Sequence, residues 1–109
     1  MSNGTAQELE STALVGNATY TMEHPYQIGK NYFIRCVTFF YTGRLVRVTA
    51  QELVLEDAAW IADTGRFAQA METGNFSEVE PYPAGELIIG RGAIVDAWQA
   101  AWVLPKTQK

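Results

Sequence analysis

The side chains that could perform acid–base, nucleophilic or metal chemistry are few in this chain. There is one histidine, His24, and one cysteine, Cys36, and they lie in sequence contexts too different to build a metal site together. Cys36 lies in an apolar run and is expected to be a small buried side chain. Glu56 and Asp57 are adjacent, so in a strand their carboxylates would point to opposite faces and could not act as an acid–base pair.

Two further patterns resemble catalytic or cofactor motifs only in part. Glu78 and Glu80 would share a face of an extended chain, but they lie in a segment with prolines and are expected to be solvated loop residues. Gly90 and Gly92 lack the third glycine and the helix that a dinucleotide-binding turn needs. No serine or threonine has a histidine partner in a familiar arrangement. The sequence therefore predicts a protein that is not an enzyme and holds no cofactor or metal.

Positive charge is the remaining candidate for ligand binding. The net charge is −4, which argues against a general, salt-driven nucleic-acid binder. Residues 25–50 nevertheless contain four basic side chains and no acidic one. Arg91, between two glycines, is a second basic feature, and it could instead pair with Asp96 or Asp57. The candidate ligand-binding residues are Lys30, Arg44, Arg47, Gly90, Arg91 and Gly92.

Length and composition favour one small domain with more apolar surface than one copy can bury. The chain has 109 residues, of which 48% are hydrophobic and 12% aromatic. A domain of this size has a high surface-to-volume ratio, so part of the apolar surface is expected at an interface between copies. A well-filled monomer core is the alternative. Tryptophans 60, 98 and 102 are expected in the core or at an interface rather than as platforms for nucleic-acid bases.

No segment suggests a membrane or an export signal. The chain has no run of 18 apolar residues, so we expect no membrane span. The first residues are polar and acidic, unlike a signal peptide. A single cysteine allows no internal disulfide, and we expect a cytoplasmic protein.

The pattern along the chain predicts a mainly β domain with one short helix. Residues 1–24 are expected to be a flexible N-terminal arm, residues 25–104 the folded domain and residues 105–109 a tail. A helix is predicted over 65–73, with Asp63 or Thr64 as its N-cap and Gly74 as its C-cap. Residues 75–85 contain two prolines and are predicted to be loop. The predicted strands, rich in aromatic and β-branched residues or alternating in polarity, are 32–41, 44–48, 52–61, 87–89 and 93–98.

Two segments together resemble the motifs of the Sm-like family. Residues 43–58, GRLVRVTAQELVLEDA, resemble the first Sm motif, which has a glycine, a leucine two residues later, a short loop, Leu-x-Leu and an Asp-Ala end. Residues 88–95, IIGRGAIV, resemble the second motif, with hydrophobic residues before an Arg-Gly pair. The two stand in the family's order and, with the segment between them, cover about half of the chain.

The resemblance implies a small, strongly bent five-stranded barrel with a helical insertion at about residues 63–85. Gly43 would permit the sharp strand bend, because a bend needs a position without a Cβ. Members of the family form rings of six or seven subunits, in which the last two strands of neighbouring subunits pair edge to edge. In such a ring Arg91 would line the pore or its rim, repeated once per subunit.

Two functions follow as expectations. The first is a homo-oligomeric ring of identical subunits, which could also stack, acting as a scaffold or assembly component. The alternative is an anion-binding ring for single-stranded RNA or a small, cyclic nucleotide. Thr49 and Glu52 stand where RNA-binding members carry an aspartate and an asparagine, and the Glu52 carboxylate would repel phosphate. Nucleic acid therefore ranks second.

Overall fold

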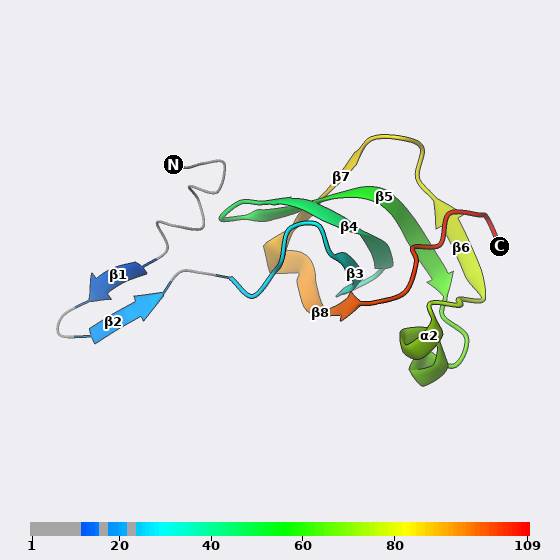
Figure 1. Cartoon of the computed structure of the whole chain (residues 1–109), viewed down its shortest axis with the longest axis horizontal. Coiled ribbons are helices and arrows are strands. Elements are labelled where there is room, and N and C mark those ends of the chain that lie inside the picture. Colours follow the sequence, from blue (N-terminus) through cyan, green and yellow to red (C-terminus); the bar gives the residue numbers. More distant parts are fainter. Residues whose placement is uncertain (1–11, 16–17, 22–23) are drawn as a thin grey trace.

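The computed structural model describes residues 12–15, 18–21 and 24–109. Within the first two ranges, strand β1 (Thr12–Val15) pairs antiparallel with strand β2 (Ala18–Thr21) in a two-stranded sheet of its own (Figure 1). The flexible arm predicted over residues 1–24 otherwise falls outside the described residues.

The main sheet contains six antiparallel strands, so the predicted mainly β class is confirmed (Figure 1). Its order is β6-β5-β4-β3-β8, and β7 pairs with β5 beside β6. One helix, α2, and a short 3-10 turn, η1, complete the described elements. The bounds are β3 Asn31–Cys36, β4 Phe40–Val48, β5 Glu52–Asp63, α2 Phe67–Thr73, β6 Glu78–Pro81, β7 Glu86–Gly90, η1 Arg91–Ala93 and β8 Ile94–Ala100.

The sheet is open, whereas the sequence predicts a closed, strongly bent barrel of five strands. The difference comes from the length of β5, which has 12 residues. Its first half pairs with β7, and its second half runs on and pairs with β6. The loop predicted over residues 75–85 is therefore wrong in part, because Val79 lies opposite Ile61 in the sheet and is fully buried. An additional strand on β5 widens the sheet on this side instead of closing it.

Strand β4 is continuous where the sequence predicts a break at Thr42 and Gly43. Its register against β5 shifts between Thr42 and Arg44, which marks a local bulge. A Cβ on Gly43 would lie 2.9 Å from the Cβ of Leu55. The sequence predicts that Gly43 permits a bend. In the structure, the absence of a Cβ at Gly43 lets β4 and β5 approach closely at the bulge. Opposite it, Asp57 has a φ of 52°, a left-handed conformation that is uncommon outside glycine.

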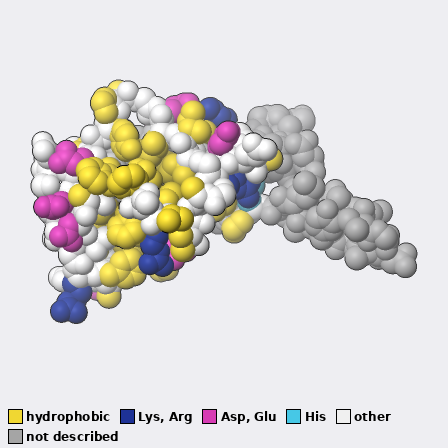
Figure 2. All heavy atoms as spheres, turned by 180° about the vertical axis from the view of Figure 1, so that it is seen from behind, with side chains coloured by type: hydrophobic (Ala, Val, Ile, Leu, Met, Phe, Trp, Pro, Cys, Tyr) yellow, Lys and Arg dark blue, Asp and Glu magenta, His cyan; other side chains and the backbone are white. Residues whose placement is uncertain are grey.

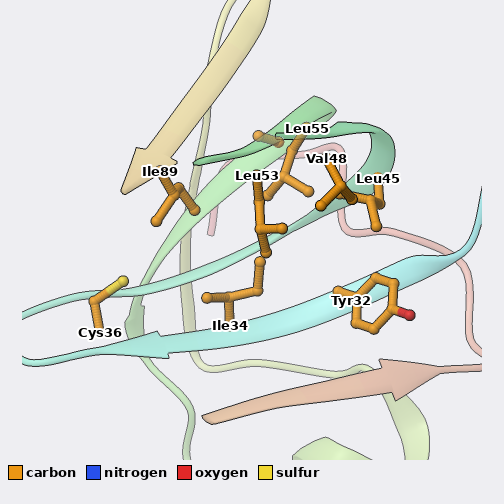
Figure 3. Packing of buried hydrophobic residues seen from close by; sticks show 9 residues of the cluster. Tyr32, Ile34, Cys36, Leu45, Val48, Leu53, Leu55 and Ile89 are labelled. Carbon is orange, nitrogen blue, oxygen red and sulfur yellow. The ribbon is translucent and has the colours of Figure 1, made fainter. Parts of the chain in front are cut away.

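Two hydrophobic clusters lie on opposite faces of the sheet, and β3 contributes to both. Tyr32 and Ile34 point into the first cluster, while Phe33 between them points into the second. This follows from the alternation of side chains along a strand. Figure 3 shows the first cluster, where side chains from β3, β4, β5 and β7 converge. Its buried members are Tyr32, Ile34, Cys36, Leu45, Val48, Leu53, Leu55, Ala58 and Ile89.

Helix α2 covers the second cluster. The predicted helix over 65–73 is confirmed over Phe67–Thr73, and Gly74 ends it with a φ of 75° and a backbone hydrogen bond to Ala70. The predicted N-cap is wrong. Arg66 occupies that position without a side-chain cap, because Asp63 instead accepts a hydrogen bond from the backbone N–H of Gly65. The second cluster consists of Phe33, Ala59, Ile61, Ala70, Phe76 and Val79.

Candidate functional site

The main sheet has two open edges, formed by β7 and β8 on opposite sides (Figure 1). In the described part of the chain, β7 pairs only with β5, and β8 pairs only with β3. The edge of β6 is different, because its Val79 exchanges two backbone hydrogen bonds with Lys109, at 3.2 and 3.0 Å. Unpaired backbone donors and acceptors on an edge strand can pair with another chain. The fold therefore offers one such edge on each side.

Both open edges carry exposed apolar side chains. Ile88 on β7 and Trp98 on β8 keep 59% and 54% of their surface accessible. Ile88 lies directly opposite Val54, and Trp98 directly opposite Phe33. Val54 and Phe33 alternate with residues of the first cluster, so Ile88 and Trp98 lie on the other face of the sheet, both on the same one. In the view from behind, apolar side chains gather over the centre of the molecule with charged groups around them (Figure 2).

Only part of this edge surface can be predicted from the sequence. Trp98 is predicted to lie in the core or at an interface, and its 54% exposure shows that it does not lie in the core of the subunit. The sequence does not predict the exposure of Ile88 and Val95. Val95 is 59% exposed and lies where the pairing of β8 with β3 shifts in register. Short strands that carry apolar side chains on both faces give the signal for such a surface.

Arg91 is held against the turn between β4 and β5. Its guanidinium Nη1 donates to the carbonyl of Thr49 at 2.7 Å and reaches the carbonyl of Ala50 at 3.4 Å. Its backbone N–H donates to the carbonyl of Gln51 at 2.7 Å, and its Cζ lies 5.7 Å from the ring centroid of Tyr26. Arg91 therefore joins the turn η1 between the two edge strands to the β4–β5 turn. Its guanidinium pairs with neither Asp96 nor Asp57, the partners that the sequence suggested.

Gly90 and Gly92 are not needed to turn Arg91. Gly90 has φ −65° and ψ 127°, an extended conformation that any residue adopts, and Gly92 has no positive φ. A Cβ on either glycine would meet no atom within 4 Å. Neither position therefore requires glycine, and the space beside both residues is open.

The basic side chains of the central segment are mostly neutralised by acids. Arg44 bridges two carboxylates, and Arg47 pairs with Glu86 at 3.2 Å. Arg35 forms two hydrogen bonds with Asp96 across β3 and β8. Lys30 is exposed and forms no ion pair with any described residue. Arg44 and Arg47, two of the predicted ligand-binding residues, are therefore engaged in ion pairs with acidic side chains.

Glu56 and Asp57 do meet, contrary to the expectation that they point to opposite faces. The guanidinium of Arg44 donates to Glu56 at 3.0 Å and to Asp57 at 2.5 Å. The left-handed φ of Asp57 interrupts the alternation of side chains, which explains the difference. The hydrogen bond from Arg44 also lowers the pKa of the Asp57 carboxyl. These carboxylates are ion-pair partners at a bulge.

The histidine and the cysteine have surroundings that match structural roles. Cys36 is buried in the first cluster, and this burial raises the pKa of its thiol, which disfavours the reactive thiolate. His24 is half-buried, and its ring lies 5.9 Å from that of Tyr26. Over the residues that the structure describes, no group of three His, Cys, Asp or Glu side chains could hold a metal ion.

Comparison with family models, curated proteins and solved structures finds no match for this chain. Within the described ranges, no helix is both long enough and apolar enough to cross a membrane.

Proposed function

We propose that the protein is a non-enzymatic scaffold or assembly component that works as a closed ring of identical, Sm-like subunits. The observation that carries the proposal is the position of β7 and β8 at opposite sides of one sheet, each with an unpaired edge. A head-to-tail contact between two different surfaces is the kind that closes into a ring when the rotation between subunits allows it.

The two edges are compatible with each other. Strand β7 has five residues and β8 has seven, so nearly all of β7 can pair along β8 of the next copy. In a sheet continued across this joint, Ile88 and Trp98 lie on the same face and can cover each other, since both face the side of Val54 and Phe33. Pairing would bury apolar surface and satisfy backbone groups in one step.

The turn between the edge strands supports the same proposal. Arg91 hydrogen-bonds this turn to the carbonyls of Thr49 and Ala50, which fixes the angle between β7 and β8. A fixed angle between the two edges favours a closed ring over a mixture of open chains. The two segments that resemble the Sm motifs contact each other at this turn. In this role Arg91 positions the joint strands.

The mass of the particle in solution tests the proposal. At micromolar chain concentration we expect six or seven times the chain mass of 12.1 kDa, measured by native mass spectrometry or light scattering. Replacing Ile88 or Trp98 with lysine should convert the particle to monomer, because an exposed lysine blocks edge pairing. Neither side chain is buried in the subunit, so both variants should stay folded.

A matched control is Val37→Lys, which adds the same charge at a side chain that is 81% exposed and lies in the turn between β3 and β4. This variant should keep the mass of the unchanged protein. A monomeric unchanged protein, or rings that survive both edge substitutions, would overturn the proposed joint.

A further inference from the structure

A cavity of about 300 Å³ opens on the sheet away from β7 and β8, in a place that the ring proposal does not use. Four aromatic side chains, two prolines and one carboxylate line it. Of these residues, the sequence predicts Glu80 to be a solvated loop residue and Trp60 to lie in the core or at an interface. The lining residues are Phe39, Tyr41, Trp60, Glu80, Pro81, Tyr82 and Pro83.

Cross-strand pairing builds the floor of this cavity. Tyr41 on β4 lies directly opposite Trp60 on β5, and Trp60 lies directly opposite Glu80 on β6. Directly opposed residues project from the same face of a sheet. The three side chains therefore stand in a row on rigid strands, which fixes their positions better than loops would.

The aromatic rings form walls at steep angles to each other. The rings of Phe39 and Trp60 are 5.7 Å apart at 88°, and those of Phe39 and Tyr41 are 6.3 Å apart at 61°. The ring of Tyr82 lies 6.5 Å from that of Tyr41, at 36°. Phe39 and Tyr82 remain 46% and 43% exposed. The rings of Phe39 and Tyr82 are therefore only partly covered by other side chains and remain accessible to a ligand.

Negative charge accompanies the rings. In the part of the chain that the structure describes, Glu80 forms no salt bridge and accepts one hydrogen bond, 3.2 Å long, from the side chain of Gln108. Burial, and then the neighbouring Tyr82, raise the pKa of the Tyr41 hydroxyl, so Tyr41 keeps its neutral form. Aromatic rings beside a carboxylate are complementary to a cation that is weakly hydrated.

We propose that this cavity binds a methylated ammonium group, as carried by choline-type small molecules and by methylated lysine side chains. Several aromatic faces and one carboxylate recognise this chemistry together, because the rings attract the spread positive charge and the methyl groups fill apolar space. An ordinary lysine ammonium is more strongly hydrated and fits such a site less well.

Titration with choline, with N-acetyl-trimethyllysine amide and with the uncharged isostere 3,3-dimethylbutan-1-ol tests this, followed by tryptophan fluorescence or calorimetry. We expect both trimethylammonium compounds to bind, and the isostere to bind about tenfold more weakly or not at all. The cation that binds more tightly indicates whether the ligand is a choline-type small molecule or a methylated lysine side chain. Equal binding of the isostere, or no binding of either cation at millimolar concentration, would overturn the proposal.

Three variants separate the contribution of the rings from that of the charge. Trp60→Leu should weaken choline binding about 5- to 30-fold, because one aromatic wall is lost. Glu80→Gln should weaken it by a smaller factor that shrinks as salt is added. Glu78→Gln, on the same strand but outside the cavity lining, removes the same charge and should leave binding unchanged. Equal effects of the two glutamine variants would show that overall charge, and not this site, attracts the cation.

Discussion

Phe33→Ala should destabilise the protein by about 3–5 kcal/mol. Phe33 is 2% exposed at the centre of the second cluster. Its ring lies 5.6 Å from that of Phe40, 5.8 Å from Phe76 and 6.1 Å from Phe67. Removing it leaves a cavity between the sheet and α2 that the surrounding rings cannot fill. The loss is large because small domains have only about 5–15 kcal/mol of stability in total.

Urea unfolding at one fixed chain concentration measures this loss, since the stability of an assembly depends on concentration. Phe67→Ala is the matched control, because it removes the same kind of side chain from a ring that contacts Phe33 at 6.1 Å but is 50% exposed. It should cost clearly less than Phe33→Ala. Equal losses would contradict the position of Phe33 at the centre of the second cluster.

Gly74→Ala should cost about 1–3 kcal/mol, because two penalties fall on one residue. The φ of 75° at the end of α2 is unfavourable for alanine. A Cβ there would also lie 2.6 Å from Cδ2 of Trp102. Trp102 packs edge-on against Phe76 and donates a hydrogen bond to the carbonyl of Met71 at 2.8 Å. The added methyl group must displace this indole.

Unfolding free energy together with tryptophan emission tests this second expectation. Displacement of Trp102 into water should shift the emission to longer wavelength in the folded state. Gly29→Ala is the control, since its φ is 91° but a Cβ there would meet nothing within 4 Å. It carries the backbone penalty alone, so an equally large loss in both variants would contradict the role given to Trp102.

Local patterns allowed the sequence to predict most of the elements. Alternating polarity and β-branched residues located the strands around Leu45, Leu53 and Ile88. Helical spacing together with Gly74 located the end of α2. The gap between the strands predicted over 87–89 and 93–98 coincides with the short turn η1. These features depend on a few neighbouring residues, so one sequence is enough to read them.

The features that the sequence did not predict depend on strand register. Pairing between β4 and β5 shifts twice, and pairing between β5 and β6 shifts once. Each shift changes which side chains lie together, as when Asp57 comes to share Arg44 with Glu56. The row of Tyr41, Trp60 and Glu80 exists only in the observed register. Bulges of this kind carry no local signal outside glycine, and so the aromatic cavity could not be derived from spacing.

The proposed joint pairs the β7 edge of one subunit with the β8 edge of the next. Mixing one variant blocked at each edge tests this pairing. Ile88→Lys blocks the β7 edge and keeps an intact β8, while Trp98→Lys blocks β8 and keeps an intact β7. Each variant alone should be monomeric. Mixed in equal amounts, they share one intact joint per pair, and the other joint would bring two lysines together.

Native mass spectrometry of this mixture is the most direct test of the ring proposal. The proposal predicts a heterodimer of twice the 12.1 kDa chain mass, containing one copy of each variant and growing no further. A mixture that stays monomeric, or homodimers of one variant alone, would contradict a head-to-tail joint between β7 and β8 and with it the closed ring.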